Sequence, residues 1–153
     1  MCYKIWLWMP LFYFRRKKMK TKVYAYLPEE AKMIRESVFV QEQGFKNEFD
    51  DLDQIAKHIV IFESQEPMAT CRIYYSNQRR CYVLGRIAVL KEYREKKLGS
   101  ALLKAAEEEI IGNKIELLAQ ERAAAFYEKN GYKKLDEHEL DEGCPHVWMR
   151  KEI

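Results

Sequence analysis

The residues with the clearest chemical potential lie where a short basic turn joins a predicted strand to a predicted helix. The strand Arg86–Val89 is followed by the turn Arg94–Gly99 (REKKLG), and a helical pattern begins at Leu98. The first backbone N–H groups of a helix have no partner within it and lie at the positive end of its dipole. Together with the cationic side chains of the turn, they could bind a phosphate-rich ligand. The alternative is a solvated basic turn without a ligand.

The segments before this turn predict a strand, a helix and an antiparallel meander. The residues KVYAYL (Lys22–Leu27) alternate as in a strand, Pro28 begins a helix, and Gly44 ends it. The apolar face of that helix comprises Ala31, Ile34, Val38 and Gln41. An acidic loop extends to Asp53, and three apolar runs at short spacing then form the meander: His58–Glu63, Met68–Tyr75 and Tyr82–Leu90.

The segments after the turn alternate between helix and strand. They are a helix over Leu98–Ile111, a strand over Lys114–Gln120, a short helix over Glu121–Lys129, and a tail over Tyr132–Glu152 whose last apolar run is His146–Met149. This order predicts an α/β (α+β) sandwich. Its mixed, mostly antiparallel sheet has six to seven strands, with helices on both faces.

Composition and charge narrow the class of protein. The chain has 153 residues, of which 48% are hydrophobic, 33% charged and only 6 are glycine, which excludes disordered, collagen-like and coiled-coil proteins. Five basic residues lie in the first 18 positions. The remaining 22 basic and 24 acidic side chains give a slightly acidic protein, so we expect no nucleic-acid partner.

Residues 1–18 differ in kind from the rest of the chain. Their apolar stretch is too short to span a bilayer, and the basic run RRKK follows it, whereas a signal peptide has its cations first. We expect an extension outside the domain, with translation starting at Met19, and a single domain over residues 19–153. The alternative is an anchor at a membrane interface.

Cysteine and acidic residues give no sign of a metal site. The four cysteines (Cys2, Cys71, Cys81 and Cys144) form no CxxC pair, which favours reduced thiols and a cytoplasmic protein. Asp50, Asp51 and Asp53 lack the spacing of an EF-hand, so we expect no metal. With Glu42 and Glu48 they hint instead at a cationic ligand.

Two motifs carry a resemblance to a known superfamily. The turn reads Arg94-x-x-Lys97-x-Gly99, and one strand later the chain reads FYEKNGY over Phe126–Tyr132. In spacing, order and setting they resemble the GNAT-type N-acetyltransferases, across about Lys20–Lys151. VFVQEQ (38–43) and GCPHVWM (143–149) resemble a small bacterial branch. Lys97 stands where the family has a glycine, and Gln120 where many relatives have asparagine.

The resemblance implies acetyl-CoA as co-substrate and direct attack of an amine on its thioester. It assigns the cofactor to the backbone of Ile87, Ala88 and Val89, to the pyrophosphate loop of Arg94, Glu95, Lys96, Lys97, Leu98, Gly99 and Ser100, and to Gln120. It assigns protonation of the leaving thiolate to Tyr127. For the base it leaves two candidates: Glu42, beside the acceptor pocket, and His146, because histidine is a common general base.

The acceptor implied is a primary amine of a small molecule or a peptide. A non-catalytic CoA-binding module remains the alternative, because Lys97 and Gln120 depart from the family pattern. We do not expect a membrane partner beyond the anchor considered above. Similar proteins often pair through a sheet edge, so a homodimer is one of the oligomeric states left open.

Overall fold

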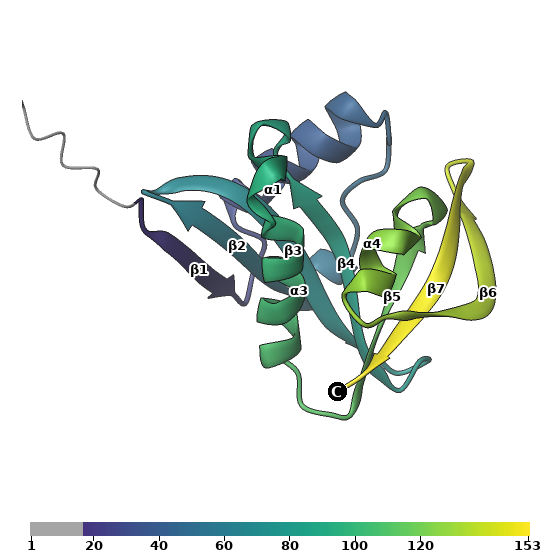
Figure 1. Ribbon diagram of the computed structural model, residues 1–153. Coiled ribbons are helices and arrows are strands. Elements are labelled where there is room, and N and C mark those ends of the chain that lie inside the picture. Colours follow the sequence, from purple (N-terminus) through teal and green to yellow (C-terminus); the bar gives the residue numbers. More distant parts are fainter. Residues whose placement is uncertain (1–16) are drawn as a thin grey trace, which may run out of the picture.

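A seven-stranded sheet forms the centre of the computed structural model, which describes residues 17–153 (Figure 1). Its strands are β1 (Met19–Tyr24), β2 (Lys57–Glu63), β3 (Glu66–Ser76), β4 (Cys81–Val89), β5 (Lys114–Gln120), β6 (Lys133–Asp141) and β7 (Cys144–Glu152). They lie in the order β1-β2-β3-β4-β5-β7-β6, and all neighbours are antiparallel except β4 and β5. The predicted mixed, mostly antiparallel sheet is confirmed.

Short helices connect these strands. They are α1 (Glu29–Arg35), the π-helix η1 (Glu36–Glu42), α2 (Leu52–Ile55), the 3₁₀-helix η2 (Lys91–Lys96), α3 (Leu98–Glu108), the 3₁₀-helix η3 (Glu121–Ala123) and α4 (Ala124–Lys129). The helix predicted over Leu98–Ile111 therefore ends three residues earlier, and α2 was not predicted. The prediction about residues 1–18 falls largely on residues 1–16, which lie outside the described part of the chain.

The run Ile59–Phe62 shows why helices cover both faces of the sheet. Side chains alternate across a strand, so a run buried on both faces contains no polar interruption. Ile59 and Ile61 lie in a core cluster with α3, whereas Val60 and Phe62 lie in a second cluster with α1. The two helices therefore pack on opposite faces, as the sequence pattern predicted.

Two predictions for the first helical region are wrong in detail. The first strand is Met19–Tyr24 rather than Lys22–Leu27, because the chain already bends at residues 25 and 26 before α1 begins. The helix that follows changes to π geometry after Arg35. A π-turn contains more residues than an α-turn, so the α-helical spacing fails and Gln41 is exposed rather than on the buried face. Gly44 ends the helix as predicted, with φ of 80°.

No helix within residues 17–153 has both the length and the apolar character that crossing a membrane requires.

Candidate active site

The site begins where the only parallel pair of strands within the described sheet separates. β4 and β5 pair over Tyr82–Leu84 and Ile115–Leu117. Beyond this point, among the strands of residues 17–153, β4 pairs only with β3 and β5 only with β7. A register shift in β4 opposite Thr70–Arg72 marks a β-bulge at this point, and Arg86 within it has φ of 52°. A bulge bends its strand away from its neighbour. The sheet therefore opens beyond Leu84.

The open side of β4 presents backbone groups that pair with no strand in the described part of the chain. The N–H of Leu90 donates to the carbonyl of Met68 in β3. Because backbone groups alternate in direction along a strand, those of Val89 face the opposite side, toward β5. The carbonyl of Val89 accepts a hydrogen bond there from Nε of Arg94, at 3.1 Å. This edge can pair with an extended amide chain as an added strand would.

The predicted anion-binding turn lies beside this edge. It comprises η2 and the first turn of α3, with Lys97 at the N-cap. Lys97 has φ of 57° and ψ of 29°, which is the left-handed conformation that glycine adopts most readily. Lys97 therefore adopts the conformation that would suit the glycine of the family pattern, at a steric cost that glycine does not have. The side chain of Lys96 bonds to Glu63 at 2.8 Å, and Leu98 is buried, so at Leu98 only the backbone can face a ligand.

Gly99 is required by packing rather than by its backbone angles. A Cβ atom at this position would lie 2.8 Å from the Cζ atom of Phe126, closer than such atoms normally approach. Phe126 belongs to the second motif, on α4, and its ring packs edge to face against Tyr127 with the centroids 5.1 Å apart. The two sequence motifs are therefore in direct contact.

Arg94 and Glu42 form a bidentate ion pair. Both hydrogen bonds, Nη1 to Oε2 and Nη2 to Oε1, are 2.7 Å long. The hydrogen bond from Arg94 lowers the pKa of the Glu42 carboxyl, which makes it a weak proton acceptor. Glu42 does not line the cavity between β4 and β5. The structure thus brings a predicted base to the predicted phosphate-binding arginine rather than to the cavity.

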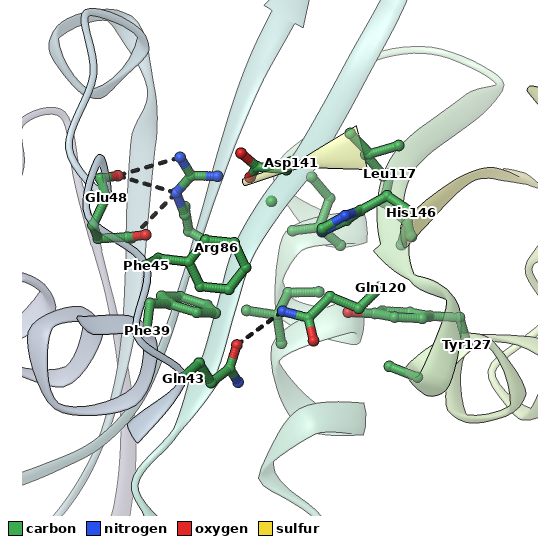
Figure 2. A pocket seen from close by; sticks show the side chains of 15 residues that line it. Phe39, Gln43, Phe45, Glu48, Arg86, Leu117, Gln120, Tyr127, Asp141 and His146 are labelled. Carbon is green, nitrogen blue, oxygen red and sulfur yellow. Dashed lines mark hydrogen bonds and ion pairs between the residues drawn. The ribbon is translucent and has the colours of Figure 1, made fainter. Parts of the chain in front are cut away.

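The cavity itself has a volume of about 170 Å³ and is lined by both remaining candidates, His146 and Tyr127 (Figure 2). His146 is 7% exposed, and its Nδ1 lies 2.8 Å from the carbonyl oxygen of Cys144. Since a carbonyl only accepts, Nδ1 carries the hydrogen, and Nε2 of the neutral ring has a free lone pair. Burial raises the pKa of the Tyr127 phenol, so this group is protonated at neutral pH.

Two polar contacts join the walls of the cavity. Nε2 of Gln120, at the end of β5, donates to Oε1 of Gln43 at 2.8 Å (Figure 2). The carboxylate of Glu142, in the turn between β6 and β7, accepts from the backbone N–H groups of Lys46 and Asn47 at 3.0 to 3.2 Å. Both ends of the Gln120 amide are thus engaged, because its oxygen accepts a hydrogen bond of 2.8 Å from Nε of Arg122.

Sequence reasoning missed several lining residues. Arg86, Phe39 and Phe45 line the cavity together with Asp141. Phe39 and Gln43 belong to the VFVQEQ segment that carried part of the resemblance, so that segment held a signal for them. Asp141 lies in an acidic tail whose pattern gave no indication of a site.

Three carboxylates of the acidic loop already have cationic partners within the protein. Asp53 accepts from both Arg35 and Arg72, at 2.6 and 2.7 Å, and Glu48 accepts from Arg35 at 2.7 Å. Asp50 accepts from Arg72 at 2.6 Å. These carboxylates neutralise buried arginines. The sequence suggested that the acidic loop attracts a cationic ligand. For Glu48, Asp50 and Asp53 this suggestion is corrected, because their partners are arginines of the same chain.

Comparison with known proteins agrees with this geometry. The acetyltransferase (GNAT) domain family matches residues 24–153. YjcF of Bacillus subtilis, described as an uncharacterized N-acetyltransferase, is 35% identical over 130 residues, which cover 81% of this chain and 91% of YjcF. The crystal structure of a candidate N-acetyltransferase of Lactobacillus plantarum has a TM-score of 0.79 at 29% identity, and the match covers 89% of this chain and 99% of that one.

A more distant structure shares the fold alone. It is an aminoglycoside 6′-N-acetyltransferase complexed with coenzyme A, with a TM-score of 0.65 at 14% identity, and the match covers 87% of this chain and 96% of that one. The match to the family over residues 24–153 and the relationship to YjcF decide the assignment. The chain belongs to the GNAT acetyltransferase family and is an acetyltransferase.

Proposed function

We propose that this protein transfers an acetyl group from acetyl-CoA to a primary amine by direct attack of the amine on the thioester. The observation that carries the proposal is the separation of β4 from β5 beyond Leu84, which leaves a free strand edge leading to a cavity that holds His146 and Tyr127. The coenzyme A complex of the aminoglycoside acetyltransferase, which shares this fold, supports the choice of cofactor.

The chain offers three groups of partners for acetyl-CoA. The backbone groups of Ile87 and Val89 pair with the amides of the pantetheine arm, whereas those of Ala88, which the resemblance also assigned to the cofactor, face β3. The N–H groups of Leu98, Gly99 and Ser100 are the first of α3 and bind the pyrophosphate. The residues Arg94, Glu95, Lys96 and Lys97 form the rest of that loop, and Gln120 borders the arm from β5.

Each chemical task then has a residue, two of them on the cavity wall and one, Val89, on the adjoining edge of β4. Nε2 of His146 accepts the proton of the amine as the C–N bond forms. The N–H of Val89 stabilises the negative charge that develops on the carbonyl oxygen. Tyr127 donates its proton to the sulfur as the C–S bond breaks. Burial makes this phenol a weaker acid, but it also raises the pKa of a thiol in the same cavity.

Of the two bases that the sequence predicted, we assign the role to His146. Glu42 is held outside the cavity by its ion pair with Arg94, and the pyrophosphate of the cofactor would compete with Glu42 for this guanidinium.

The test is release of free CoA from acetyl-CoA by the full chain in the presence of a panel of primary amines, with the acetylated product identified by mass. We expect amine-dependent release of CoA in equal amount to product. Tight binding of acetyl-CoA without release by any amine would support a non-catalytic CoA-binding module instead, the alternative that rests on the departures from the family pattern at Lys97 and Gln120.

A further inference from the structure

Asp141 is a charged residue of the cavity wall that forms no ion pair within residues 17–153. It lies at the end of β6, partly buried, and no Lys or Arg nitrogen of residues 17–153 comes within 4.0 Å of its carboxylate. Figure 2 shows this carboxylate at the upper edge of the cavity, on the side of Arg86. The ion pairs of Arg86 are instead with Glu48 at 3.1 Å and Asp50 at 3.3 Å.

The ion network beneath the cavity is neutral as a whole. It contains three arginines and three carboxylates: Arg35, Arg72, Arg86, Glu48, Asp50 and Asp53. Burial raises the pKa of Glu48, but its guanidinium partners oppose this, so we count it as a carboxylate at neutral pH. The cavity therefore presents one net negative charge, that of Asp141, to a ligand.

A second observation points to an amine in the same cavity. His146 is more than nine-tenths buried and, within the described part of the chain, Nε2 makes no hydrogen bond. Phe39, Phe45 and Tyr127 supply aromatic surfaces to the same walls, and such surfaces attract organic cations. A carboxylate, a proton acceptor and aromatic rings suit a ligand with one reactive amine and one ammonium group.

We propose that the acceptor is a compact amine that carries a second positive charge, and that Asp141 is the specificity-determining residue that binds this charge. The proposal rests on the proposed function and names its acceptor class. In this arrangement the ammonium group bonds to Asp141, while the reactive amine gives its proton to His146. The cavity volume of about 170 Å³ equals about five or six water volumes at ~30 Å³ each, which suits a short diamine.

The test is calorimetric titration of the full chain, with and without saturating CoA, using three ligands that share a four-carbon chain and an amine. Putrescine has a second ammonium group at its far end, n-butylamine has a methyl group, and γ-aminobutyrate has a carboxylate. We expect putrescine to bind about tenfold or more tightly than n-butylamine, and γ-aminobutyrate to bind most weakly. In Asp141→Asn the preference for putrescine over n-butylamine should fall below about threefold.

The matched control is Asp136→Asn, which removes an exposed carboxylate from the same strand and should keep the wild-type preference. Equal binding of putrescine and n-butylamine, no binding of putrescine, tighter binding of γ-aminobutyrate, or an unchanged preference in Asp141→Asn would each overturn the proposal. These ligands are scored by binding alone. Failure of the proposed function shows separately, as loss of CoA binding or of thiol release.

Discussion

Arg94 and Glu42 hold each other through two hydrogen bonds of 2.7 Å, and this pair joins η2 to the end of the π-helix η1. The same guanidinium bonds to the carbonyl of Val89 on the free edge of β4. A cofactor that pairs with this edge and brings its pyrophosphate to the turn must therefore compete with Glu42 for Arg94.

Glu42→Gln should consequently strengthen CoA binding. The pair is more than one-third exposed on both sides, and such pairs contribute about 0.2–1 kcal/mol, so we expect a gain of up to about fivefold in affinity. Calorimetric titration with CoA measures this gain in affinity. The control is Glu92→Gln, which changes an exposed residue of η2, the 3₁₀-helix that contains Arg94. A loss of kcat by two orders of magnitude without a gain in affinity would instead make Glu42 the base.

His146→Asn separates the two nitrogen atoms of the imidazole. The asparagine amide can keep the hydrogen bond from the Nδ1 position to the Cys144 carbonyl, but it has no group that accepts a proton in place of Nε2. We expect kcat/KM for the amine to fall about 10²- to 10⁴-fold, with the KM for acetyl-CoA unchanged. His138→Asn, at an exposed histidine, is the control and should keep full activity. Wild-type rates in His146→Asn would exclude it as the base.

Much of this arrangement was predictable from the sequence, for reasons that particular residues show. The run Ile59–Phe62 predicts a strand buried on both faces, because alternate side chains pack against different helices. The turn before α3 predicts an anion site from helix geometry alone. The two motifs of the resemblance contact each other through Gly99 and Phe126, on elements that occur in the order the resemblance implied.

Other features depend on contacts that spacing cannot reveal. Glu42, Glu48, Asp50 and Asp53 are alike as acidic residues of one region, yet each has an arginine partner that lies elsewhere in the chain. Their roles are decided by which arginine each one meets. Asp141 is the opposite case, since an unremarkable acidic tail brings one carboxylate to the cavity. The π-helix could not be predicted from the sequence either, because its altered period depends on local backbone geometry.

Gly99→Ala should destabilise the protein through Phe126. The added methyl group would lie 2.8 Å from Cζ of that ring, so either the ring or the start of α3 must move. We expect a loss of about 1–3 kcal/mol in the free energy of unfolding, measured by urea denaturation. The control is Gly85→Ala, where a Cβ atom would meet nothing within 4 Å. Equal stability of the two variants would show that α3 and α4 do not constrain each other as described.

The stability of the protein should fall as the pH falls below about 6.5, because of His58. Burial lowers the pKa of this histidine, whose Nε2 lies 2.9 Å from the carbonyl oxygen of Asp53, while Nδ1 is buried and has no hydrogen-bond partner among residues 17–153. The unfolded chain takes up a proton at His58 below about pH 6.5 and the folded chain does not. The unfolded state then binds more protons, so the free energy of unfolding decreases, with a limiting slope of about 1.4 kcal/mol per pH unit.

Urea denaturation between pH 7.5 and 5 measures this slope. His58→Gln can keep the hydrogen bond to Asp53 without titrating, so we expect a flatter profile, while His138→Gln should retain the wild-type one. Asp53 acts at lower pH. Burial tends to raise its pKa, but hydrogen bonds from Arg35 and Arg72 outweigh burial and hold the pKa well below its usual range. Its stabilisation is present above about pH 4 and is lost as the pH falls further.

The most direct test of the account is calorimetric titration of the full chain with acetyl-CoA, compared with the variant Arg94→Glu, whose fold is checked by its thermal unfolding. We predict clear binding by the wild-type chain and at least about tenfold weaker binding by Arg94→Glu, because the variant places a carboxylate where the pyrophosphate is expected. The absence of binding up to millimolar acetyl-CoA in the folded wild-type chain, or equal binding by both proteins, would contradict the placement of acetyl-CoA between β4, β5 and the start of α3.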